Sequence, residues 1–120
     1  MIIPSLYLFI TTTFWGTWCG PCKADHPALK NIYEQYKSQN IEFVGVAVDA
    51  SPAVVKDYLS KEKMSWTNLF VNHRDNGTES VVGKYEVNFY PLYFLINPAG
   101  EIILRGDLKN MQTELKEIFD

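Results

Sequence analysis

The apolar positions of the chain fall into short β-rich runs separated by segments with helical spacing. Residues 2–15, IIPSLYLFITTTFW, predict a buried strand, and residues 41–49, IEFVGVAVD, predict a second strand that is covered on both faces, because its β-branched run is nearly continuous. Between them, residues 21–38 predict a helix. Its apolar stripe recurs at helical spacing at Leu29, Ile32, Tyr33 and Tyr36.

The same alternation continues after the second strand. Ser51 suits the N-cap of a helix and Pro52 suits its first position, so a second helix is predicted there. Residues 66–71 predict a short strand, and the turn-rich residues 72–78 predict a solvated loop. A brief helix is then predicted over residues 79–85.

The last third of the chain predicts a hairpin and a final helix. Residues 92–97 and 101–106 are β-rich runs joined by Pro-Ala-Gly, which is typical of a hairpin. The terminal helix is predicted from an apolar stripe at Met111, Leu115, Ile118 and Phe119. The order β-α-β-α-β-α-β-β-α predicts an α/β fold with a mixed central sheet sandwiched by helices, in a single domain over residues 1–120.

Composition narrows the class of protein. With 47% hydrophobic and 21% charged residues, the chain has the balance of a well-packed globule, and 120 residues bury enough surface to need no metal or disulfide for stability. The net charge of −3 argues against nucleic acid as a partner, because a phosphate backbone demands a basic face.

The amino-terminal run at residues 2–15 is too short and too rich in threonine to span a bilayer, and it lacks the basic start and cleavage site of a secretory signal. We therefore predict a core strand and no membrane span. A chain that begins almost inside a core strand is also compatible with an excerpt of a longer protein.

The two cysteines, Cys19 and Cys22, lie three positions apart in TWCGPCK. A structural zinc site normally needs four ligands, and only His26 and His73 add soft donors. A disulfide that staples so short a loop removes little entropy from the unfolded chain. Redox exchange fits the position better than either alternative, and we predict no bound metal.

The predicted strand-to-helix junction explains this preference. The free N–H groups and the positive end of the helix dipole stabilise a thiolate at Cys19 and lower its pKa. Cys22 follows one turn later, and Pro21 stiffens the loop between the two sulfurs without losing a needed donor. We expect an exposed Cys19 sulfur and a buried Cys22 sulfur.

Two stretches resemble the thioredoxin family. FWGTWCGPCK at residues 14–23 is similar to its active-site motif, and VNFYPLYFLINPAGEII at residues 87–103 is similar to the segment that carries its cis-proline loop and hairpin. The resemblance implies a cis bond between Tyr90 and Pro91, next to Cys19, with an ordinary trans proline as the alternative. It further implies a substrate-binding surface made by Trp18, Gly20, Pro21, Tyr90 and Pro91.

The segment from residue 49 to residue 71, together with CKADHP at residues 22–27, resembles the TlpA/ResA-like thiol-disulfide interchange proteins. These are bacterial and extracytoplasmic, which implies the same location here, with the cytoplasm as the alternative. In that branch an acid at the position of Asp25 handles protons near the site, so Asp25 is the candidate acid or base, or else a solvated first-turn acid. His26 is expected on the surface.

Two positions depart from the family pattern. Thr13 stands where thioredoxins carry a buried aspartate that assists the deeper cysteine, so that acid/base route is absent. Leu92 follows Pro91 where threonine is common, which predicts a more apolar groove beside the proline.

The sequence therefore predicts a monomeric enzyme that reduces protein disulfides through Cys19 and Cys22. Its redox-active disulfide would be its only cofactor, and its partners would be protein disulfides and an upstream thiol donor. Two rival functions are a peroxiredoxin-like peroxidase and a non-catalytic binding module. The peroxidase signature P-x-x-x-T-x-x-C is not met, since Thr12 and Gly16 occupy its first two positions, and the intact cysteine pair argues against the module.

Overall fold

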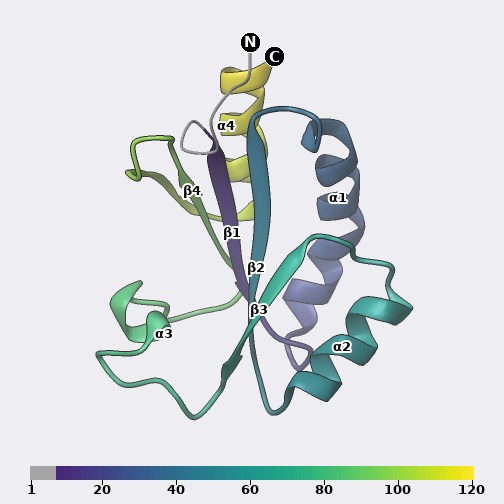
Figure 1. Cartoon of the computed structure of the whole chain (residues 1–120), viewed down its shortest axis with the longest axis vertical. Helices are drawn as coiled ribbons and strands as arrows, with labels where there is room; N and C mark the ends of the chain where they lie inside the picture. Colours follow the sequence, from purple (N-terminus) through teal and green to yellow (C-terminus); the bar gives the residue numbers. More distant parts are fainter. Residues whose placement is uncertain (1–7) are drawn as a thin grey trace.

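The structure, a computed structural model, describes residues 8–120 (Figure 1). Its elements follow the predicted order and confirm the predicted α/β class: β1 (Phe9–Trp15), α1 (Gly20–Tyr36), β2 (Ile41–Asp49), α2 (Pro52–Lys61), β3 (Thr67–Asn72), α3 (Val81–Lys84), β4 (Leu92–Ile96), β5 (Ile102–Gly106) and α4 (Leu108–Phe119). The first predicted strand is present from Phe9 on, and residues 2–7 lie outside the described residues.

The five strands form one mixed sheet in the order β3-β2-β1-β4-β5. β1, β2 and β3 are parallel, because α1 and α2 carry the chain back between them, whereas β4 pairs antiparallel with both β1 and β5 (Figure 1). Trp15 pairs with Ala47, and Phe14 pairs with Leu92. The carboxyl ends of β1 and β2 and the start of β4 therefore lie side by side at the same end of the sheet.

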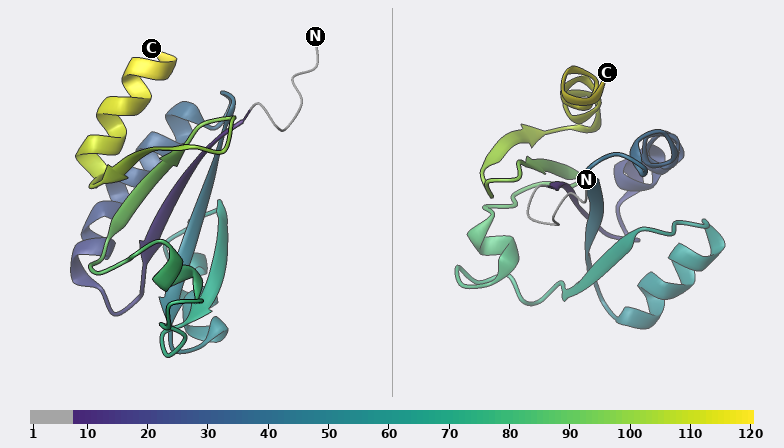
Figure 2. Two further views of the ribbon diagram at one scale, coloured as in Figure 1. Left: turned by 90° about the vertical axis from the view of Figure 1, so that its left-hand side faces the viewer. Right: turned by 45° about the horizontal axis from the view of Figure 1, so that its top comes forward.

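The two faces of the sheet have separate cores because side chains alternate along each strand. Tyr93 and Leu95 of β4 point to the face covered by α1 and α4, which both views of Figure 2 show next to each other. Leu92 and Phe94 point to the opposite face, where Val82 of α3 packs. Within residues 8–120, no helix combines the length and the apolar character needed to cross a membrane.

Candidate active site

Cys19 and Cys22 form a disulfide at the amino end of α1, with their Cα atoms 5.3 Å apart. Cys19 is the N-cap of the helix, and its sulfur accepts a hydrogen bond from the backbone N–H of Cys22 at 3.2 Å. Pro21 occupies the first turn, where a missing N–H costs nothing. The structure thus places the two sulfurs where the sequence predicted, at a strand-to-helix junction.

Both sulfurs are buried in this disulfide form. Cys19 is only 4% exposed and Cys22 is 1% exposed, so the prediction of an exposed Cys19 is wrong here. The cause is the shared apolar cluster in which both cysteines pack against Trp15, Ala47 and Val55. The acidity of the Cys19 thiol in the reduced form stays a prediction.

The loop before Cys19 is held against the end of β2. The backbone N–H of Thr17 donates to Asp49 Oδ2 at 2.7 Å, and the indole N–H of Trp18 donates to the carbonyl of Val48 at 2.8 Å. Gly16 permits this approach, since a Cβ there would lie 2.7 Å from the Val48 oxygen. Sequence reasoning missed Asp49, although an acid that ends a buried strand was a visible signal.

Removal of the Asp49 carboxylate is expected to destabilise the fold. Asp49 is 3% exposed and accepts the N–H groups of Thr17 and Ala50, so Asp49→Ala leaves two donors without an acceptor. We expect the free energy of unfolding, measured in urea, to fall by about 1–3 kcal/mol. The matched control is Asp57→Ala, which removes only an exposed ion pair with Lys61. Equal effects of the two variants would contradict the assigned role of Asp49.

The Tyr90–Pro91 peptide bond is cis, as the family resemblance implied. Tyr90 packs against the cluster that contains Cys19, and its ring meets the Trp18 ring edge-on at 5.1 Å. Trp18 is 55% exposed, so its ring, together with Tyr90, presents aromatic surface beside the disulfide. Leu92 adds nothing to this surface because its side chain is fully buried on the α3 face, and the prediction that it makes the groove more apolar is wrong.

Asp25 lies on α1 one turn after Cys22 and is partly buried. The hydroxyl of Tyr93 donates to its Oδ2 at 3.0 Å. Burial raises the pKa of the Asp25 carboxyl, the Tyr93 hydrogen bond lowers it, and the negative charge of Asp107 raises it again, with a net upward direction. A hydrogen-bonded, partly buried carboxyl does not fit the solvated alternative. Its acid/base role stays a prediction.

His26 is buried, so the expectation of a surface histidine is wrong. Its Nδ1 lies 2.7 Å from the hydroxyl of Tyr58, and its ring stands edge-on to Trp15. Burial, followed by the positive charges of Lys30 and Lys23, lowers its pKa from 6.5 to about 4. His26 lies three positions before Leu29, in line with the buried stripe of α1, but a polar side chain at this position did not reveal that Trp15 and Tyr58 cover it.

The remaining sequence candidates fall into two places. Gly20 and Pro21 are exposed at the start of α1. His73, the second soft donor, lines a hollow with Trp18, Asp49 and Ala50. The described part of the chain contains no cluster of three His, Cys, Asp or Glu side chains that would hold a metal.

A family model described as Thioredoxin-like matches residues 10–102, most of the chain. The chain belongs to the thioredoxin-like family. Two thioredoxin-like relatives are the thiol-disulfide oxidoreductases ResA of Bacillus subtilis, 36% identical over 90 residues, and of Oceanobacillus iheyensis, 34% identical over 101 residues. These relatives confirm the predicted ResA-like branch. The matches cover 75% and 82% of this chain but 48% and 50% of the relatives, so the chain spans about half the length of the relatives it matches.

Solved thioredoxin-like structures agree with the fold. A thiol-disulfide oxidoreductase from Bacteroides fragilis superposes with a TM-score of 0.81 at 24% identity, over 94% of this chain and 82% of that chain. StoA from Bacillus subtilis superposes with a TM-score of 0.74 at 24% identity, over 95% of this chain and 84% of that chain. At this level of identity the likeness concerns the thioredoxin-like fold.

Proposed function

We propose that this thioredoxin-like chain is a thiol-disulfide oxidoreductase that reduces protein disulfides. The observation that carries the proposal is the Cys19–Cys22 disulfide at the amino end of α1, next to Tyr90, which precedes the cis bond to Pro91. Two cysteines that can close into a disulfide without leaving the helix terminus can store and return two electrons. The kinship with ResA proteins supports the same chemistry.

The reduced form starts the reaction. The Cys19 thiolate attacks one sulfur of a substrate disulfide, which forms a mixed disulfide and releases the other substrate sulfur as a thiolate. The helix N-terminus favours the thiolate at Cys19, because Cys19 is the N-cap. Trp18 and Tyr90 supply the apolar surface on which the substrate chain would lie.

Cys22 completes the exchange. Its thiol loses a proton to Asp25 or to water and attacks the Cys19 sulfur, which frees the second substrate thiolate and closes the Cys19–Cys22 disulfide. Two electrons thus pass to the substrate, and an upstream thiol donor must return them. The Gly20-Pro21 pair between the cysteines resembles that of the reducing family members. We therefore expect a reduction potential closer to about −270 mV than to the value of about −120 mV that belongs to a strong oxidant.

The cellular location and the partners are inferred from the resemblance to TlpA/ResA-like proteins. This resemblance implies a location on the extracytoplasmic side of a bacterial membrane, protein disulfides as substrates and a separate thiol donor. We expect the described domain to act as a monomer, because each step uses residues of one chain. No nucleic acid or metal takes part in this scheme.

Insulin reduction in dithiothreitol tests the proposal. The untreated protein is expected to speed precipitation of the insulin B chain well above the dithiothreitol blank, whereas protein with both cysteines alkylated is expected to match the blank. A rate no higher than the blank would favour a non-catalytic binding module. Consumption of hydrogen peroxide, measured in parallel, would instead indicate the peroxidase.

A further inference from the structure

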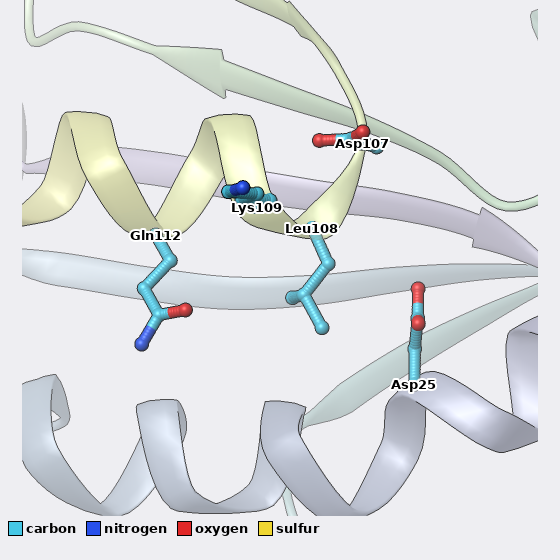
Figure 3. A pocket seen from close by; sticks show the side chains of 5 residues that line it. All are labelled: Asp25, Asp107, Leu108, Lys109 and Gln112. Carbon is cyan, nitrogen blue, oxygen red and sulfur yellow. The ribbon is translucent and has the colours of Figure 1, made fainter.

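A pocket of about 290 Å³ lies between α1 and the first turn of α4 (Figure 3). The residues that line it are Asp25, Asp107, Leu108, Lys109 and Gln112. In Figure 3, the carboxyl of Asp25 rises from α1 into the space beside Leu108 and below Asp107. Cys22 precedes Asp25 by three positions on the same helix.

Tyr93, on strand β4, forms a hydrogen bond with Asp25. Its side chain is fully buried, and its hydroxyl donates to Asp25 Oδ2 at 3.0 Å. Burial raises the pKa of Tyr93 first, and the charge of Asp25 raises it further, so the hydroxyl keeps its proton and stays a donor at neutral pH. A donor of this kind stabilises the ionised form of Asp25.

Asp107 contributes a second carboxyl at a fixed position. It is the N-cap of α4 in a capping box: its Oδ1 accepts the N–H of Asn110 at 2.8 Å, and Asn110 Oδ1 accepts the N–H of Asp107 at 3.1 Å. Its side chain is thereby held at the pocket. A negative charge there disfavours a second negative charge on Asp25.

We propose that Tyr93 and Asp107 are positioning residues that set the protonation of Asp25 from opposite directions, Tyr93 through its hydrogen bond and Asp107 through its charge across the pocket. The inference rests on the proposed role of Asp25 as the proton acceptor for Cys22. The pocket would give Asp25 a route for proton exchange with solvent that does not pass through the substrate-binding surface at Trp18 and Tyr90.

An experiment must distinguish the titration of Asp25 from that of the other ionisable groups around it. Tyr93 comes from β4, and Asp107 and Lys109 come from the start of α4. Cys22 precedes Asp25 on α1 and titrates only in the reduced protein, while the buried ring of His26 lies against Trp15 and Tyr58. Titration of the oxidised protein therefore isolates Asp25 from the cysteines.

The test is an NMR titration of the Asp25 carboxyl carbon in the oxidised protein. Tyr93→Phe removes the donor and is expected to move the midpoint to higher pH. Asp107→Asn removes the charge but keeps a good N-cap, and it is expected to move the midpoint to lower pH. The matched control is Glu117→Gln, which removes an exposed charge from α4 at a position that does not line the pocket.

Two further variants guard against effects on folding. Asp107→Ser gives a second uncharged N-cap and should repeat the downward shift, whereas Asp107→Glu keeps the charge and should restore the midpoint toward that of the wild type. Midpoints that stay with the Glu117→Gln control, or that move in the same direction in Tyr93→Phe and Asp107→Asn, would overturn the inference.

The reduced protein then separates this inference from the proposed function. If ionised Asp25 accepts the Cys22 proton, the acidic limb of the rate of mixed-disulfide resolution moves to lower pH in Asp107→Asn and to higher pH in Tyr93→Phe. At a fixed pH on that limb, we expect rates to differ from wild type by about two- to fivefold. Shifted NMR midpoints with an unshifted rate limb would uphold the coupling and reject Asp25 as the acceptor.

Discussion

Replacing Cys22 by serine is expected to stop turnover and to leave Cys19 joined to its substrate in a stable mixed disulfide. The resolving thiol is absent in this variant, while the N-cap position that favours the Cys19 thiolate is untouched. We expect insulin-reduction turnover to fall by at least about 100-fold, since the two cysteines act as a unit. Non-reducing gels and intact mass measurement would detect the adduct.

Cys19→Ser is the matched control for this experiment. It keeps Cys22, so it is expected to lose turnover and to form no adduct. The comparison matters because the disulfide form buries both cysteines almost completely, and exposure alone does not identify the attacking sulfur. An adduct in Cys19→Ser with none in Cys22→Ser would reverse the two assigned roles. In the native host, the Cys22→Ser variant would also capture the substrates themselves.

Acidification is expected to destabilise the protein through His26. Burial lowers the pKa of His26 to about 4, while the same side chain in the unfolded chain titrates near 6.5. Between these values the unfolded chain binds a proton that the folded protein does not, so stability is fully present above pH 6.5 and falls as the pH falls. We expect His26 to account for a loss of about 2 kcal/mol between pH 7 and pH 5.

Urea unfolding at the two pH values, in matched glutamine variants, isolates this contribution. His26→Gln keeps a hydrogen-bonding group beside Tyr58 but cannot titrate, so its loss of stability on acidification should be smaller than that of the wild type by the stated amount. His73→Gln changes the other histidine, which is exposed in a loop, and should behave like the wild type. A wild-type pH dependence retained in His26→Gln would show that His26 is not responsible.

Local patterns predicted the order of the elements closely. Residues 41–49 form β2 as predicted, and Ser51 caps α2 by accepting the N–H of Val54. These features depend on neighbours within a few positions, such as the run of β-branched residues or the side chain that can cap a helix. The position of Cys19 and Cys22 at a helix start is of the same local kind.

The burial of the site residues was not predictable in the same way. His26 lies under Tyr58 of the next helix, and Cys19 shares a cluster with Val55, so each exposed fraction depends on how α2 packs over α1. His26 lies in line with the buried stripe of α1, but its polar side chain does not reveal that Trp15 and Tyr58 cover it. Cys19 was wrongly assigned as exposed because the residues that cover it come from β1, β2 and α2.

The sequence by itself determined the α/β order, the paired cysteines at a strand-to-helix junction and the cis Tyr90–Pro91 bond, which the family resemblance implied. Only the tertiary structure decided which groups surround them. Thr17 meets Asp49 across 32 positions, and Tyr93 meets Asp25 across 68. Such contacts are set by strand register and by the packing of helices on the sheet, because only the folded sheet brings together side chains so far apart in the chain.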